Sequence, residues 1–393
     1  MSALLHPWPA WPSYSEEEVS AVSRVLRSGL VNYWTGEECR LFEQEFAAYC
    51  GTSHAVALAN GSVAIELALK CLGIGPGDEV IVTPRSYFAS VSSIVLVGAV
   101  PVFADVDPGT QNITAESVAR KISGKTKALI CVHLAGNPCD MDPLLALARK
   151  HGLRVIEDCA QAHGARYKGK MVGSIGDIGT WSFCQDKIMT TGGEGGMVTT
   201  NSRELWSAMW SHKDHGKNWE QVYSGKHGQG FRWLHESFGT NWRMTEMQGV
   251  LGRVQLSRMP EWTRRRQINA RRIWDVARTL RGLRVPEIVE GGEHAAYKAY
   301  VCAEPAALKE GWTRDRIMLE VLEAGVPCLT GSCPEIYLEK AFDGTGWRPV
   351  ERLPVARLLG ETSLMLLVHP TLEEEHITQT CEVLSSVMGR ATR

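Results

Sequence analysis

Lys187 is the residue whose type and position most directly suggest covalent chemistry. It follows an apolar run at 180–183 and precedes a glycine-rich stretch at 192–196. A lysine placed between a strand and such a loop can approach a ligand closely, and its neutral amine can form a Schiff base with a carbonyl compound. A lone lysine is more often a solvated surface side chain, so the neighbouring loops must decide between these two interpretations.

Asp158 and Gln161 form a second polar group, directly after the apolar run at 153–156. A carboxylate buried at a strand end is costly unless a cation or hydrogen-bond donors meet it. Asp158 therefore implies a positively charged partner such as a protonated ring nitrogen. The alternative is a helix cap or a metal ligand. His163 is the only nearby nitrogen ligand and the zinc-type spacings are absent, so we predict no metal.

A third group, Asn60, Gly61 and Ser62, follows the apolar run at 54–58 and opens a helix expected at 63–72. Small residues at a helix start leave its free amides and the positive end of its dipole available to an anion. This arrangement suits a phosphate group. The alternative is that Ser62 is a cap that merely starts the helix.

The sequence does not match the other motifs that are typical of nucleotide binding or of hydrolysis. Gly124-Lys125-Thr126 resembles the end of a phosphate-binding P-loop, but Ala119 occupies the place of its first glycine. Residues 73–77 lack the spacing of a dinucleotide fingerprint. There is no nucleophile-elbow serine motif. The three loops described above are therefore the candidate site.

These loops need a sheet that brings their strand ends together. Short apolar runs alternate with helix-length segments, at 54–58, 79–83, 101–103, 128–132, 153–156 and 180–183. The pattern predicts an α/β fold with a mostly parallel sheet sandwiched by helices. In an open parallel sheet, ligands bind outside the carboxyl ends of the strands, where the three loops lie.

Helices are expected on the N-terminal side of this sheet. Residues 15–18 open an amphipathic helix that Gly29 ends, and a second helix at 38–49 stops at Gly51.

The pattern of predicted secondary structure changes beyond Met244. Long helical stretches, interrupted at Pro260, are followed by a mixed segment. We predict a large ligand-binding domain at 1–250, which includes the N-terminal helices, and a smaller α+β domain at 251–393.

Composition excludes several classes of protein. The chain has 42 Lys and Arg against 44 Asp and Glu, without a long block of one sign, so nucleic acid is not an expected partner. Eleven cysteines without a CxxC pair indicate reduced thiols and a cytoplasmic location. No basic and apolar leader and no run of about 18 apolar residues is present. We therefore expect no signal peptide and no membrane span.

The combination of motifs, in its order along the chain, resembles the sugar aminotransferases of the DegT/DnrJ/EryC1/StrS family, within the fold-type I pyridoxal-phosphate enzymes. The matching pieces are ALANGSVAIELAL, GPGDEVIVTP, GAVPVFADVD, VIEDCAQAHGARYKG, SFCQDKIMTTGGEGGMV and GTNWRMTEMQ. They extend over nearly the whole chain. The resemblance implies pyridoxal 5'-phosphate as the cofactor.

The resemblance also assigns roles to residues of this chain. Lys187 would hold the cofactor through a Schiff base, and Asp158 would pair with the pyridinium nitrogen. Gln161 would bond the phenolic oxygen. The residues expected at the cofactor phosphate are Gly61, Ser62 and Ser182.

Two further roles follow from the same resemblance. Phe88 would stack on the cofactor ring, although Tyr87 adjoins it in the sequence. Asn241 would reach the cofactor phosphate of a neighbouring subunit, which implies a homodimer with shared active sites.

The implied reaction moves an amino group from an amino acid, glutamate by resemblance, to a keto sugar carried on a nucleotide, for amino-sugar biosynthesis. Relatives carry a histidine and a proline near a substrate loop, whereas the segment 325–334 has no histidine. This departure leaves a cyclitol ketone open as the acceptor.

A sugar dehydratase and a non-catalytic regulator are the alternatives to an aminotransferase. A sugar dehydratase of similar sequence would have a histidine at position 187, so Lys187 argues against it. A non-catalytic regulator that binds pyridoxal phosphate would need an output module, and no helix-turn-helix segment precedes residue 50 or follows residue 250. Retention of Lys187, Asp158 and Gln161 together favours an enzyme.

Overall fold

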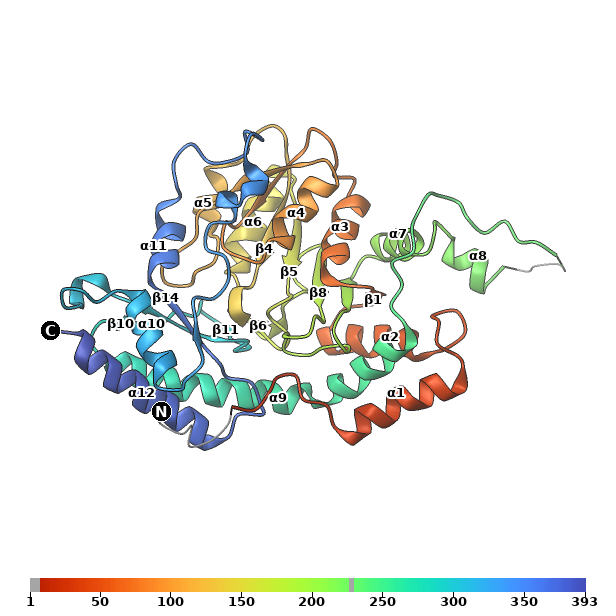
Figure 1. Ribbon diagram of the computed structural model, residues 1–393. Coiled ribbons are helices and arrows are strands. Elements are labelled where there is room, and N and C mark those ends of the chain that lie inside the picture. Colours follow the sequence, from red (N-terminus) through yellow and green to blue (C-terminus); the bar gives the residue numbers. More distant parts are fainter. Residues whose placement is uncertain (1–7, 226–229) are drawn as a thin grey trace.

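A mostly parallel sheet forms the centre of the molecule, as expected (Figure 1). The computed structural model describes residues 8–225 and 230–393, and within these ranges the strand order is β1-β9-β8-β5-β4-β2-β3. β9 is antiparallel to β1 and to β8, whereas the other neighbours pair in parallel. The strands are β1 (His54–Leu58), β2 (Glu79–Val82), β3 (Val100–Phe103), β4 (Thr126–Val132), β5 (Arg154–Asp158), β8 (Ile178–Ser182) and β9 (Gly196–Thr200).

Helices cover both faces of this sheet. Val80 and Val82 pack into one core cluster together with side chains of α3, α4 and α7, while Ile81 faces a second cluster with side chains of α5 and α6. Because both faces are buried, β2 and β4 carry consecutive apolar residues instead of alternating apolar and polar ones. The helices are α3 (Gly61–Cys71), α4 (Ala89–Leu96), α5 (Ala115–Ala119), α6 (Met141–His151), α7 (Arg203–Lys213) and α8 (Trp219–Tyr223).

The two N-terminal helices begin and end where the sequence predicts. Ser15 and Glu18 form a capping box at the start of α1 (Glu16–Ser28), and Gly29 ends it in the left-handed conformation. Gly51 ends α2 (Glu38–Cys50) in the same way.

The helix α9 (Glu246–Thr279) runs through Pro260 without a break, so the predicted interruption there is wrong. Proline removes one backbone hydrogen bond. However, α9 packs against α1 and α2 in its first half and against α12 further on, and tertiary packing of this kind supplies most of the stability of a helix in a protein.

A second, antiparallel sheet lies in the C-terminal part, with the strand order β10-β12-β14-β13. Its strands are β10 (Leu283–Arg284), β12 (Ala299–Ala303), β13 (Cys328–Leu329) and β14 (Ser363–Leu366). Its helices are α10 (Arg314–Glu323), α11 (Pro354–Thr362) and α12 (Glu374–Ala391). The proposed domain boundary at residue 250 falls inside α9 and stays a prediction.

A small sheet joins the two parts of the chain, because β11 (Gly292–Glu293) pairs with β6 (Arg166–Tyr167), which pairs with β7 (Lys170–Met171). In the part of the chain that the structure describes, no helix combines the length and apolar character needed to cross a membrane.

Glu157, at the end of β5, is a buried carboxylate that ties this strand to the following loop. It is fully buried and accepts hydrogen bonds from four groups, namely His133 Nε2 at 3.0 Å and the amides of Gly173, Ile175 and Gly176 at 2.9, 2.8 and 2.7 Å. Burial alone raises the pKa of Glu157, but these donors outweigh it and hold the pKa below its ordinary value.

We expect Glu157→Gln to lower the free energy of unfolding by about 2–4 kcal/mol near neutral pH, because the new NH₂ group faces backbone donors. A carboxyl whose folded pKa is depressed stabilises the protein above its unfolded pKa and loses that effect as the pH falls through the folded pKa. Urea unfolding of the wild type and of Glu157→Gln should therefore show a difference in the free energy of unfolding that becomes smaller as the pH is lowered. Glu116→Gln, at an exposed ion pair with Arg120, is the control and should change little. An equally large loss in the control would contradict the prediction.

Candidate active site

A cavity of about 530 Å³ lies at the carboxyl ends of the central strands. The loops after β1, β2, β5 and β8 meet there, as the positions of the three polar groups predict. The lining residues include Gly61, Ser62, Ser86, Tyr87, Ser90, Asp158, Gln161, Ser182, Asp186 and Lys187.

The end of the cavity at which the sequence predicts a phosphate site is built from α3 and the end of β8. The Asn60 side chain caps α3 by accepting from the Val63 amide at 3.0 Å, so the alternative in which Ser62 is the cap is wrong. The first amides of α3, at Gly61 and Ser62, have no partner within the helix. A Cβ on Gly61 would lie 2.6 Å from the Cβ of Ser182, so only glycine allows this close approach.

Asp158 is buried inside the cavity wall, with 5% of its surface exposed. Its Oδ2 accepts from the Ser90 hydroxyl at 2.7 Å and its Oδ1 accepts from the Ala160 amide at 3.1 Å. Burial raises the pKa of Asp158 in spite of these bonds and of the positive charge of Lys187. A cationic ligand group facing this carboxylate would offset the cost of its burial.

Lys187 lies in a network that the sequence did not indicate. Its Nζ is 3.3 Å from Asp186 Oδ1, and the Tyr297 hydroxyl donates to Asp186 Oδ2. The same Nζ lies 5.4 Å from the centre of the Tyr297 ring. Burial raises the pKa of Asp186, but Lys187 and Tyr297 outweigh it and hold the pKa below its ordinary value. The amine is therefore held at the cavity by an anionic partner and an aromatic face.

Gln161 links the large sheet to the C-terminal part of the chain. Its Oε1 accepts from the Ala135 amide at 2.8 Å, and its Nε2 donates to Ser332 Oγ at 3.4 Å. Nearby, the Ser86 amide donates to the Cys333 carbonyl at 3.1 Å. The segment 325–334, which contains no histidine, thus contacts two residues of the cavity wall, Gln161 and Ser86.

The aromatic residue at the cavity is Tyr87 and not Phe88. Tyr87 lines the cavity and is 69% exposed. Phe88 is partly buried against a core cluster, with its ring edge-on to Phe342 at 6.3 Å. Phe88 precedes the first residue of α4 as its N-cap. The stacking role assigned to Phe88 stays a prediction, and the position of Tyr87 at the cavity makes Tyr87 the second candidate.

Asn241 does not line the cavity of its own chain. It is exposed and pairs with Asp214 in an isolated bridge. Its neighbour Trp242 accepts from the Ala59 amide at 2.9 Å. The predicted contact with the phosphate of a second subunit stays a prediction.

One cluster of metal-ligand types occurs within residues 8–225 and 230–393, formed by His133, Glu157 and Cys159. The oxygens of Glu157 are already occupied by four hydrogen bonds. His163, the nitrogen ligand considered from the sequence, packs between the rings of Trp181 and Phe183. Both ring nitrogens of His163 are buried and have no hydrogen-bond partner among the described residues. The absence of a metal therefore stays a prediction.

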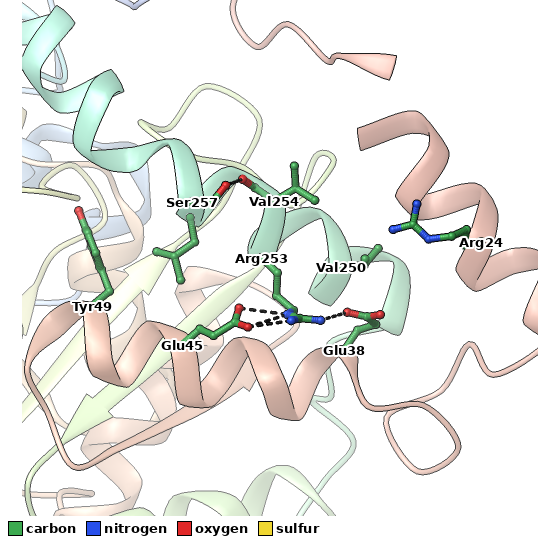
Figure 2. Close-up of a pocket in the computed structure, with 9 residues that line it drawn as sticks. Arg24, Glu38, Glu45, Tyr49, Val250, Arg253, Val254 and Ser257 are labelled. Carbon is green, nitrogen blue, oxygen red and sulfur yellow. Dashed lines mark hydrogen bonds and ion pairs between the residues drawn. The ribbon is translucent and has the colours of Figure 1, made fainter. Parts of the chain in front are cut away.

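A second cavity, of about 580 Å³, lies between α1, α2 and α9 (Figure 2). The positive charge of Arg253 in this cavity is already paired, because its guanidinium donates to both oxygens of Glu45 and to Glu38. None of the loops that carry the predicted chemistry reaches it, so it is not the candidate active site.

The residues of the first cavity fit pyridoxal phosphate. Gly61, Ser62 and Ser182 offer amides, hydroxyls and a positive helix end to a phosphate, while Asp158 offers a buried carboxylate to a protonated ring nitrogen. Lys187 offers an amine, and Tyr87 offers a ring face.

This fold and this set of groups define an enzyme of the aminotransferase class, and the comparisons with known proteins agree. The model of the DegT/DnrJ/EryC1/StrS aminotransferase family matches residues 12–385. A crystal structure of an aminotransferase from Psychrobacter cryohalolentis is similar with a TM-score of 0.96 and 59% identity, over 98% of this chain and 99% of that one.

Two curated relatives are similar over most of their length. GDP-perosamine synthase of Caulobacter vibrioides is 37% identical, over 88% of this chain and 89% of that protein. L-glutamine:2-deoxy-scyllo-inosose aminotransferase of Streptoalloteichus tenebrarius is 38% identical, over 76% of this chain and 71% of that protein. The chain belongs to the DegT/DnrJ/EryC1/StrS aminotransferase family. The predicted enzyme class, and pyridoxal phosphate as its cofactor, are confirmed.

We expect Tyr87→Ala to weaken pyridoxal phosphate binding by a factor of up to about ten, because stacking on an aromatic ring contributes about 0.5–1.5 kcal/mol. Phe88→Ala should instead lower the unfolding midpoint in urea and leave the affinity nearly unchanged. Titration of the two apoproteins with the cofactor, followed by absorbance, measures both affinities. Weaker binding by Phe88→Ala than by Tyr87→Ala would contradict this expectation and support the assignment of Phe88 made from the sequence.

Proposed function

We propose that the protein transfers an amino group from L-glutamate to the ketone of a nucleotide-linked sugar, and that Lys187 is the residue to which the cofactor attaches. The observation that carries this proposal is the convergence of Lys187, Asp158 and Gln161 on one cavity. These three side chains come from the loops after two neighbouring strands, β5 and β8.

Each of the three residues has a distinct task in the proposed reaction. Pyridoxal phosphate, when bound, supplies an electron sink for the negative charge that develops at the substrate carbon. Asp158 would keep a proton on the ring nitrogen, since its burial makes an unpaired carboxylate costly. Lys187, once free, would act as the base that takes a proton from the substrate carbon and returns it at the cofactor. Gln161 would donate an N–H to the phenolic oxygen.

The network around Lys187 supports its role as a base. Asp186 and Tyr297 would hold the released amine beside the cavity and prevent it from turning into solvent. A base held within reach of the proton that it moves gains rate through orientation.

The acceptor is inferred from relatives. GDP-perosamine synthase is named for a nucleotide-linked amino sugar, which favours a keto sugar carried on a nucleotide and amino-sugar biosynthesis as the role. The second relative is named for a keto cyclitol and for L-glutamine as donor, so a cyclitol ketone is the alternative acceptor. The segment 331–333 adjoins Gln161 and Ser86 at the cavity and would contact either substrate.

A homodimer with shared sites is also part of the proposal. Asn241 is exposed and lies outside its own cavity, at the end of the segment 230–241, which suits a residue that completes the phosphate site of a second subunit. Exposed aromatic side chains on the same segment, Phe231, Trp233 and Phe238, would be covered in such a dimer.

An absorption spectrum tests the central proposal. We expect the purified protein to show the visible band of a lysine-linked cofactor, and glutamate to convert it to the shorter-wavelength amine form of the cofactor. Lys187→Ala should lack the lysine-linked band and lose activity by several orders of magnitude. Lys298→Ala, at another lysine beside Tyr297, is the control and should retain that band.

A cofactor band that glutamate, glutamine and other amino donors leave unchanged would sink the transaminase proposal. Conversion by glutamine alone would correct the donor. Once the donor is known, nucleotide-linked keto sugars and keto cyclitols can be compared as acceptors by the return of the original band.

Mixed dimers test whether the active sites are shared. In a dimer of Lys187→Ala and Asn241→Asp subunits, one of the two sites combines an intact Lys187 with an intact Asn241. An equal mixture that re-associates at random should therefore regain about a quarter of the wild-type activity. The control mixture, Lys187→Ala with Asp158→Ala, should regain none, because both residues lie in the same subunit's cavity. Equal recovery in the two mixtures would overturn the shared site.

A further inference from the structure

The described N-terminal segment, residues 8–15, connects the C-terminal part of the chain to the backbone of the candidate catalytic lysine. We name it the N-terminal strap. At one end the Trp8 indole N–H donates to the Gly325 carbonyl at 2.7 Å, and further along the Trp11 indole N–H donates to the Lys187 carbonyl at 2.8 Å. In Figure 1 the strap runs alongside α9 before α1 begins.

Trp11 is held by aromatic rings. Its ring packs edge-on against Trp262 at 5.1 Å and stacks with His369 at 6.0 Å. The carbonyl of Ala10, the preceding residue, accepts from the Thr371 hydroxyl at 3.3 Å. The indole is therefore fixed by α9 and by the loop before α12.

A buried cation adds to this anchoring. The guanidinium of Arg266 lies 4.7 Å from the centre of the Trp11 ring, and its Nη1 donates to the Tyr297 carbonyl at 3.3 Å. Within the described residues, its Nε and Nη2 have no hydrogen-bond partner. The face of Trp11 offsets part of the cost of this buried charge, because an aromatic face attracts a desolvated cation. If Trp11 moved away, the buried charge of Arg266 would lose this stabilisation.

The bond from Trp11 completes the anchoring of Lys187. The Lys187 amide donates to the Cys184 carbonyl at 3.1 Å, and the Lys187 carbonyl accepts from Trp11. With both its amide and its carbonyl bonded, the residue has a fixed backbone, and its side chain leaves that backbone toward the cavity.

We infer that Trp11 is a positioning residue, which holds the Lys187 backbone so that the amine meets the cofactor carbonyl in a reactive orientation. The inference rests on the proposed role of Lys187. It goes beyond that role because it assigns a function in the active site to a segment that does not line the cavity.

The test compares Trp11→Phe with Trp8→Phe. Each variant keeps an aromatic ring and loses one indole N–H in the strap, but only Trp11 bonds to Lys187. Apoprotein is mixed with pyridoxal phosphate, and formation of the lysine-linked band is followed in time. We expect attachment to slow by about 3–10-fold in Trp11→Phe, the usual effect of one hydrogen bond, and by less than about twofold in Trp8→Phe. Thermal melting of both apoproteins reports their stability.

Borohydride reduction followed by peptide mapping separates the possible failures. If the wild type is labelled at Lys187 and Trp11→Phe attaches at the wild-type rate, the positioning role is wrong. The same holds if both variants slow equally in step with their melting temperatures, because the strap then acts through stability alone. Labelling of another lysine in the wild type would instead refute the proposed role of Lys187. If Trp11→Phe does not fold, Trp11→Met provides a large apolar side chain without a hydrogen-bond donor.

Discussion

The buried carboxylate of Asp158 is the constraint on which the rest of the site depends. It lies at the end of a central strand, and among the described residues its side chain accepts from two donors, the Ser90 hydroxyl and the Ala160 amide. Burial raises its pKa. Its neighbour Glu157 lies in a different environment, in which its carboxylate accepts four hydrogen bonds from protein groups. Two adjacent acidic residues therefore have different roles. Glu157 is satisfied by the protein and stabilises the fold, whereas Asp158 has capacity left for a ligand.

Close backbone packing sets the distance between the parts of the site. A Cβ on Gly61 would collide with Ser182, and a Cβ on Gly196 would lie 2.2 Å from the Asn60 carbonyl. These two glycines bring the start of α3 directly against β8 and β9. The helix amides, and the serine at the end of β8, thereby face one small volume, which is what a phosphate requires.

The C-terminal part of the chain completes a site whose main groups lie in the first half. Tyr297 bonds to Asp186, Ser332 bonds to Gln161, and Tyr300 accepts from the Ser332 amide at 2.8 Å. A Cβ on Gly331 would collide with Tyr300. The surroundings of Gln161 and Asp186 therefore depend on the position of the C-terminal part against the central sheet. The strap across this junction links that position to the Lys187 carbonyl.

Local sequence determined much of this protein. The runs of apolar residues predicted the parallel sheet, and the polar loops after them predicted the groups that converge on one cavity, among them Lys187, Asp158 and Gln161. These signals are local, because a strand end and the loop that follows it are adjacent in sequence. What the sequence missed depends on contacts between distant segments or on the direction of a single side chain. The strand β9 is short and follows a glycine-rich loop, so only its pairing with β1 and β8 identifies it. The position of Tyr87 at the cavity depends on where α4 begins, and the contacts of Tyr297, Ser332 and Trp11 join residues more than 100 positions apart. Such contacts carry no local periodicity, so only the tertiary structure could decide them.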